Sequence, residues 1–253
     1  MPINQAAIDQ LKAAGFLDTL PPVPQRLISQ IAGEEKTGKS HLSLTGPGPV
    51  IYHSIDVGTE GVVEKFQQQG KQIFVKEIRY QRGEPKSVYE DMWQTFKKDF
   101  DLGLSMGQGT VVLDTWTEVY ELARLAKFGK LEQVQAHHYG PVYAELRGMI
   151  RDIYNTPMSA CLLTKMAKDY TTKELTEKGF GDTGFLVQLN ARTSRTIGAD
   201  GKPVYNLWIK DSRLNAKNLT NLTLTSNALD ANGQTIDQFD FSYLLYLAHN
   251  WAG

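Results

Sequence analysis

The stretch 33-GEEKTGKS-40 carries the complete spacing Gly-x-x-x-x-Gly-Lys-Ser. It follows an apolar segment of strand length at residues 26–32 and precedes a predicted helical turn, which is the context that a phosphate-binding P-loop requires. Glycines allow backbone N–H groups to close around phosphate oxygens, and the N-terminus of the helix adds positive potential. The stretch therefore predicts a nucleotide site between a buried strand and a helix.

The chemistry of this loop gives its side chains separate roles. Lys39 would reach the terminal phosphates and contribute to catalysis, and the Ser40 hydroxyl would be a ligand of Mg²⁺. The predicted cofactors are therefore ATP and Mg²⁺. The residues expected to contact the nucleotide are Gly33, Glu34, Glu35, Lys36, Thr37, Gly38, Lys39, Ser40 and His41.

Asp114 is the predicted partner of Ser40 at the metal. Residues 109–114 form a short apolar strand that ends in this carboxylate. Because parallel strands deliver their carboxyl ends to one edge of a sheet, Asp114 would lie near the loop and support Mg²⁺ binding without being a direct ligand. A predicted helix follows at once, so an N-cap role is the alternative, and the two roles are compatible.

ATP hydrolysis also needs a carboxylate that orients or deprotonates the attacking water. Many P-loop enzymes place a glutamate directly after the strand aspartate, but here Thr115 occupies that position and Glu118 lies one helical turn further on. The adjacent strand at residues 50–55 runs into Asp56 and Glu60. We expect Glu60 to be the base, with Asp56 as second candidate and a surface-loop role as the alternative for each.

Thr164 is a candidate sensor of the γ-phosphate. It ends the apolar strand 159–164, which in this class of sheet would lie between the loop strand and the strand of Asp114. Lys165 and Lys168 follow, and they could contact DNA, the nucleotide of a neighbouring subunit or only solvent.

Two further cations, Lys210 and Arg213, lie at and just after the end of a predicted strand. Lysine and arginine stabilise charge on phosphates, so both are expected at the nucleotide of a neighbouring subunit, acting in trans. His137 and His138 lack a third ligand at helical spacing, and we expect no metal site there.

The order of elements predicts an α/β protein with a RecA-like P-loop core. Early strands at 26–32, 50–55, 72–78, 109–114 and 159–164 are separated by segments of helical pattern, among them 88–104 and 142–154. Late strands at 185–190 and 204–210 are joined by a hairpin turn at 198–201. This pattern predicts a mostly parallel sheet flanked by helices, with an antiparallel extension on its C-terminal side.

Composition bounds the remaining possibilities. The chain has 253 residues, 41% hydrophobic and 22% charged, which is typical of a globular protein with one large domain. The helical spacing at 4–16 and the prolines within 20–24 predict an N-terminal helix and Pro-rich linker at 1–25, followed by one RecA-like ATPase domain at 26–253. No run approaches the roughly 18 apolar residues of a membrane span, and the polar start is unlike a signal peptide, so we expect a cytoplasmic protein. With a formal charge of −1, any nucleic-acid contact must come from local loops or an oligomer's inner surface. The single cysteine, Cys161, is expected in a buried strand.

Several segments resemble those of phage-encoded RecA-like ATPases, a group that includes the Sak4-type single-strand annealing proteins and related phage nucleotide-binding proteins. The similar segments, in the same order, are 33–40, 47–56, 111–118, the pair Tyr139-Gly140 and 162–164. The resemblance covers residues 26–213. The chain departs from the group at Lys165-Met166, where members often carry a small residue and then histidine.

The resemblance implies an oligomeric ATPase that acts on single-stranded DNA in phage recombination or replication, in the cytoplasm of a bacterial host. A phage or host single-strand-binding protein would be a further partner. One alternative is a nucleotide-switched assembly or loader protein that does not touch DNA. A small-molecule kinase is less favoured, because P-loop kinases usually have arginine-rich lids and the arginines here are scattered.

Overall fold

The computed structural model describes residues 5–16, 24–55, 61–130, 135–168, 174–226, 228–229, 235–236 and 240–250. Asp56 and Glu60, the two predicted base candidates, lie outside the described residues, as does segment 17–23 of the Pro-rich linker.

The helices are α1 (Gln5–Ala13), α2 (Lys39–Leu44), α3 (Val62–Gln68), α4 (Lys86–Leu104), α5 (Trp116–Phe128), the 3-10 helix η1 (Ala136–Tyr139), α6 (Gly140–Tyr154), α7 (Thr183–Leu186), α8 (Ala216–Leu219) and α9 (Phe241–His249). The strands are β1 (Ile28–Gly33), β2 (Val50–Ser54), β3 (Ile73–Glu77), β4 (Thr110–Asp114), β5 (Ser159–Lys168), β6 (Leu175–Glu177), β7 (Leu189–Ile197), β8 (Pro203–Ser212), β9 (Thr223–Thr225), β10 (Ala228–Leu229) and β11 (Thr235–Ile236). None of the described helices is long and apolar enough to cross a membrane.

The loop strand β1 lies inside a mostly parallel sheet. Within the described ranges, nine strands join this sheet in the order β3-β2-β4-β5-β1-β7-β8-β9, with β6 paired to the outer part of β5. The pairs from β3 through to β7 are parallel, whereas β8 and β9 are antiparallel to their neighbours. The position of β5 between β1 and β4 and the hairpin turn at 198–201 are both as predicted. The structure thus confirms the RecA-like α/β core with an antiparallel C-terminal extension.

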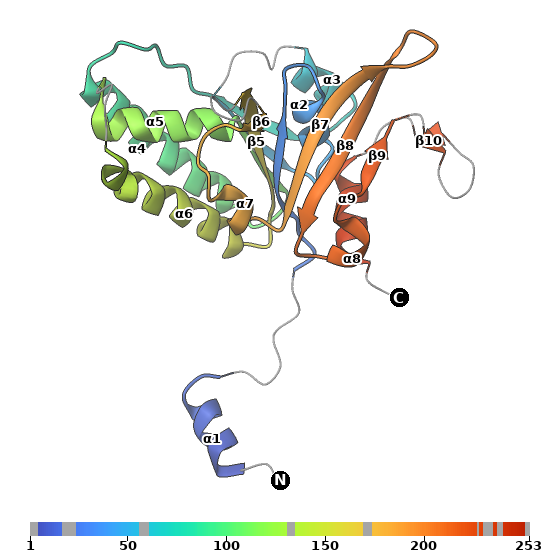
Figure 1. Cartoon of the computed structure of the whole chain (residues 1–253). Coiled ribbons are helices and arrows are strands. Elements are labelled where there is room, and N and C mark those ends of the chain that lie inside the picture. Colours follow the sequence, from blue (N-terminus) through green and yellow to red (C-terminus); the bar gives the residue numbers. More distant parts are fainter. Residues whose placement is uncertain are drawn as a thin grey trace.

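Helices cover both faces of the sheet (Figure 1). Helices α4, α5 and α6 pack on one face, and α2, α3 and α9 pack on the other. Because successive strand residues point to opposite faces, Val111 and Leu113 of β4 join the first core whereas Val112 joins the second. Cys161 of β5 is buried in the second core, as expected.

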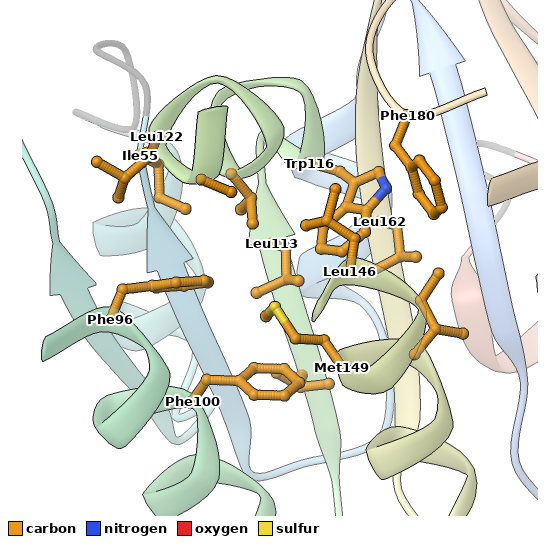
Figure 2. Packing of buried hydrophobic residues seen from close by; sticks show 14 of the residues in the cluster. Ile55, Phe96, Phe100, Leu113, Trp116, Leu122, Leu146, Met149, Leu162 and Phe180 are labelled. Atoms are coloured by element: carbon orange, nitrogen blue, oxygen red, sulfur yellow. The ribbon is translucent and has the colours of Figure 1, made fainter. Parts of the chain in front are cut away.

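The first core is rich in aromatic side chains. Figure 2 shows Phe96 and Phe100 of α4 and Trp116 of α5 gathered with Leu113 of β4 and Met149 of α6. The aromatic side chains of α4 therefore face the core rather than forming an exposed stacking surface.

Two predicted elements differ in the structure. Residues 185–190 do not form a strand, because the chain makes the short helix α7 first and enters β7 only at Leu189. The apolar run that suggested a strand includes Phe185, whose side chain is 78% exposed. Thr164 does not end its strand either, since pairing with β6 extends β5 to Lys168.

His53 of β2 is a buried polar residue in the first core. Its ring contacts Phe96 and Phe100, and among the described residues neither ring nitrogen has a hydrogen-bond partner. Burial lowers the pKa of His53 from 6.5 to about 4. The charge of Asp99 opposes this shift, and the charge of Lys76 adds to it. The imidazole is therefore neutral in the folded protein at neutral pH.

This burial predicts a loss of stability in mild acid. Between pH 6.5 and about pH 4 the unfolded chain binds a proton at His53 that the folded chain does not, so stability falls with falling pH. The loss should approach about 3 kcal/mol, at 1.36 kcal/mol per pKa unit. Urea unfolding at each pH measures the free energy of unfolding, and this free energy should decrease less in acid for His53→Leu than for the wild type. The variant His138→Leu, which changes an exposed histidine, should show the same decrease as the wild type. Equal acid losses in all three proteins would contradict the assignment.

Candidate active site

The phosphate loop connects the end of β1 to the start of α2. Gly38 and Lys36 have left-handed backbone angles, with φ of 93° and 59°, which turn the chain sharply before the helix. Gly33 cannot carry a side chain, because a Cβ there would lie 2.2 Å from Thr193 Oγ1 and 2.7 Å from Thr37 Oγ1. The two threonine hydroxyls are themselves 2.7 Å apart, so a hydrogen bond connects Thr37 of the loop to Thr193 of β7.

Ser40 and Asp114 meet at the edge of the sheet where the loop lies. Ser40 Oγ donates to Asp114 Oδ2 at 2.6 Å, and the Tyr52 hydroxyl donates to the same oxygen. Asp114 and Tyr52 are both buried. Burial, and then the neighbouring carboxylate, raise the pKa of Tyr52 far above its ordinary value, so the hydroxyl remains a donor. Sequence reasoning missed Tyr52 because an apolar strand position normally marks only the core.

Lys39 extends over the loop. Its Nζ donates to the carbonyl oxygens of Gly33 at 2.9 Å and Glu34 at 2.7 Å. Glu34, Glu35 and Lys36 are exposed, whereas His41 is half-buried. The His41 ring contacts the Phe66 ring edge-on, with 4.8 Å between the ring centroids. The ammonium group is thus held at the mouth of the loop, where a phosphate would replace the carbonyls as its partner.

Thr164 lies beside the loop strand and is buried. Its register partner in β1 is Ala32, and its Oγ1 accepts a hydrogen bond from Gln30 Nε2 at 3.2 Å. Gln30 was another residue that sequence reasoning missed. The contact fixes the rotamer of Thr164 from the loop strand itself.

Lys165 is engaged in an ion pair rather than being a solvated loop lysine. Its Nζ lies 2.7 Å from Glu118 Oε1, while the Tyr80 hydroxyl donates to Glu118 Oε2 at 2.5 Å. Burial acts to raise the pKa of Glu118, but these two hydrogen bonds and the positive charges of Lys165 and Lys178 together leave the pKa below its ordinary value. Glu118 is therefore a charged residue with two fixed partners.

Lys210 and Arg213 do not join the loop of their own chain. In β8, Lys210 is level with the middle of β1, and Arg213 follows Ser212, which pairs with the start of β7. The phosphate loop begins after Gly33, which is level with Thr193 of β7 and through it with Leu207 of β8. The action of both cations in trans therefore stays a prediction.

The site fits a magnesium nucleotide better than a metal bound by protein alone. In the described part of the chain, no three His, Cys, Asp or Glu side chains gather as metal ligands. Mg²⁺ usually takes one or two protein oxygens and completes its shell with phosphates and water. Ser40 and Asp114 would hold it, and Lys39 with the N–H groups of the loop would hold the phosphates.

The Tyr52 hydroxyl predicts a metal-dependent effect. Tyr52→Phe removes one donor from Asp114 but keeps the ring, so affinity for ATP in Mg²⁺ should fall roughly tenfold, from a loss of about 1.4 kcal/mol. Affinity for ATP in EDTA should not change. The matched control is Tyr89→Phe, because Tyr89 lies in the first core and its hydroxyl donates a hydrogen bond to Gln81 O. An equal loss with and without metal would contradict this role for Tyr52.

No protein-family model and no curated protein matches this chain. Among solved structures, a similar one is described as a prototypical ATPase from the type III secretion system of pathogenic bacteria, with 14% identity and a TM-score of 0.49. The alignment covers 66% of this chain and 51% of that one, so the chain matches about half of that protein's length. The loop and the strand order place the chain among P-loop nucleotide-binding folds.

Proposed function

We propose that this protein binds Mg²⁺-ATP at residues 33–40 and hydrolyses the bond between its β- and γ-phosphates. The observation that supports this most directly is the contact of 2.6 Å between Ser40 Oγ and Asp114 Oδ2. It brings a hydroxyl ligand and a carboxylate together at the mouth of a loop that also presents Lys39, the set that Mg²⁺ and phosphates require.

Each residue would have a defined task. Lys39 would move from the loop carbonyls to the terminal phosphates, where it neutralises charge. Thr164 would offer its hydroxyl toward the γ-phosphate while Gln30 holds it. Bound Mg²⁺ would stabilise the negative charge that builds up on the phosphate oxygens.

We infer that Glu60 is the general base, with Asp56 as the second candidate. Ile55, the residue before Asp56 in the sequence, donates its backbone N–H to the backbone oxygen of Asp114 at 2.6 Å, so the end of strand β2 lies beside Asp114. Glu118 is less suited, because Lys165 and Tyr80 already bind its two carboxylate oxygens.

Single-stranded DNA and a homo-oligomeric state complete the proposal. Both rest on the resemblance of residues 26–213 to phage-encoded RecA-like ATPases, which act on DNA as oligomers. In such an assembly, Lys210 and Arg213 of a neighbouring subunit would be available to the nucleotide. DNA-stimulated ATP turnover would distinguish this proposal from a loader protein that does not touch DNA.

Removing the loop lysine tests the nucleotide site. Lys39→Ala deletes the cation nearest the terminal phosphates and should weaken ATP binding at least about tenfold, since hydrogen bonds to charged groups contribute about 1.5–3 kcal/mol. Calorimetric titration with Mg²⁺-ATP measures this, and Lys65→Ala on the exposed side of α3 is the matched control. Unchanged affinity in Lys39→Ala would remove the basis of the proposal.

Neutralising the proposed base separates binding from chemistry. Glu60→Gln should bind ATP as the wild type does but hydrolyse it roughly 10²- to 10⁴-fold more slowly, the usual contribution of a general base. Phosphate release in single-turnover reactions gives the rate. Asp56→Asn and Glu118→Gln are measured beside it, and a wild-type rate in Glu60→Gln would transfer the role to whichever of these is slow.

A further inference from the structure

A cavity of about 470 Å³ lies between strands β1, β7 and β8 and the segment that joins β6 to β7. Lys178, Lys210 and Arg213 bring three positive charges to its lining. Lys210 and Arg213 would therefore contact a ligand that is bound in this cavity of their own chain. The strand levels described above place Arg213 toward the end of the sheet away from the phosphate loop.

The carboxylates of the lining already have partners in the protein. Glu177 accepts from Arg192 Nε at 2.7 Å and lies 3.9 Å from Lys210 Nζ. Burial acts to raise the pKa of Glu177, but the hydrogen bond from Arg192 contributes to lowering it below its ordinary value. Asp211 Oδ1 accepts from Asn190 Nδ2 at 2.8 Å. With its carboxylates engaged in this way, the cavity favours an anion, and arginine is well suited to phosphate.

Asn190 also indicates that the ligand carries hydrogen-bond donors. This side chain lines the cavity and is 8% exposed. Its Nδ2 donates to Gly184 O at 2.9 Å and to Asp211 Oδ1, which fixes the orientation of the amide. Its Oδ1 accepts no hydrogen bond from the described residues, although buried acceptors nearly always have a donor.

An aromatic ring completes the cavity. Phe185 lies in its lining, and at 78% it is the most exposed large hydrophobic residue in the described part of the chain. Exposed aromatic rings beside positive charges are typical stacking surfaces for nucleobases. We propose that this cavity binds a nucleoside monophosphate unit, either as one link of single-stranded DNA or as a free nucleotide.

Gln30 connects this cavity to the phosphate site. It contributes to the lining of the cavity, and its Nε2 donates to Thr164 Oγ1 at 3.2 Å. A ligand that moves Gln30 would therefore also move the proposed γ-phosphate sensor, which gives the two sites a shared element. This coupling rests on the proposed function, whereas binding in the cavity does not.

Binding is tested without ATP, on the full chain. A labelled oligodeoxythymidylate is titrated by fluorescence anisotropy over a series of salt concentrations, and free dTMP and inorganic phosphate are titrated by calorimetry. The double variant of Lys210→Gln and Arg213→Gln should bind the oligonucleotide at least about tenfold more weakly. For this variant, the slope of log affinity against log salt concentration should become less steep by roughly 0.7 for each phosphate contact removed.

Two further variants make the assignment specific. Phe185→Ser alters an exposed ring, so folding should be kept, and it should weaken binding without changing the salt dependence. Lys98→Gln on the exposed face of α4 is the matched control for loss of one charge and should bind as the wild type does. Tight binding of dTMP with the same pattern identifies a free-nucleotide site, and binding of the oligonucleotide alone identifies a nucleic-acid site.

Three results would overturn the inference: no binding of oligonucleotide or dTMP, binding of inorganic phosphate as tight as that of dTMP, or variants that bind like the wild type. Lys39→Ala should bind the oligonucleotide normally without ATP, so failure of the proposed ATP site remains a separate outcome. If ATP alters oligonucleotide affinity, Gln30→Leu should lose that response. A retained response would remove Gln30 as the connection.

Discussion

The hydrogen bond between Ser40 and Asp114 is the constraint on which the rest of the site depends. It joins the first turn of α2, the helix that follows β1, to the last residue of β4, and in the sheet β5 lies between β1 and β4. Because Asp114 is buried, its carboxylate must be hydrogen-bonded, and Ser40 and Tyr52 both donate to it. These donors hold the carboxylate where Mg²⁺ would need it, so the site is formed by the fold before any ligand arrives.

The parallel register of the sheet brings the remaining groups to this point. Gly33 is paired with Lys165 and with Thr193, while Asp114 is paired with Leu163, so β1 and β4 end within two residues of each other along β5. Beyond this level, β5 and β7 continue and form antiparallel pairs with β6 and β8. The phosphate loop therefore lies between longer strands, one carrying the proposed sensor and the other supporting the loop through Thr193.

Much of this could be predicted from sequence because its signals are local. The glycines and lysine of residues 33–40, the apolar strand ending in Asp114 and the turn at 198–201 each carry their own pattern, and the strand order follows from them. Tyr52, Gln30 and Thr193 could not be recognised, since their partners lie 62, 134 and 156 residues away and only the sheet register brings them together. The prediction of a strand at 185–190 was wrong because apolar composition does not reveal that Phe185 faces solvent.

A crystal structure of the protein with Mg²⁺ and a non-hydrolysable ATP analogue would test the central claim most directly. The account predicts that the oxygen of the Ser40 hydroxyl becomes a ligand of the metal while its O–H group still points to the Asp114 carboxylate. It also predicts that Lys39 Nζ leaves the carbonyls of Gly33 and Glu34 for the terminal phosphates. A nucleotide bound elsewhere, or a bound metal that does not have Ser40 Oγ as a ligand, would contradict it.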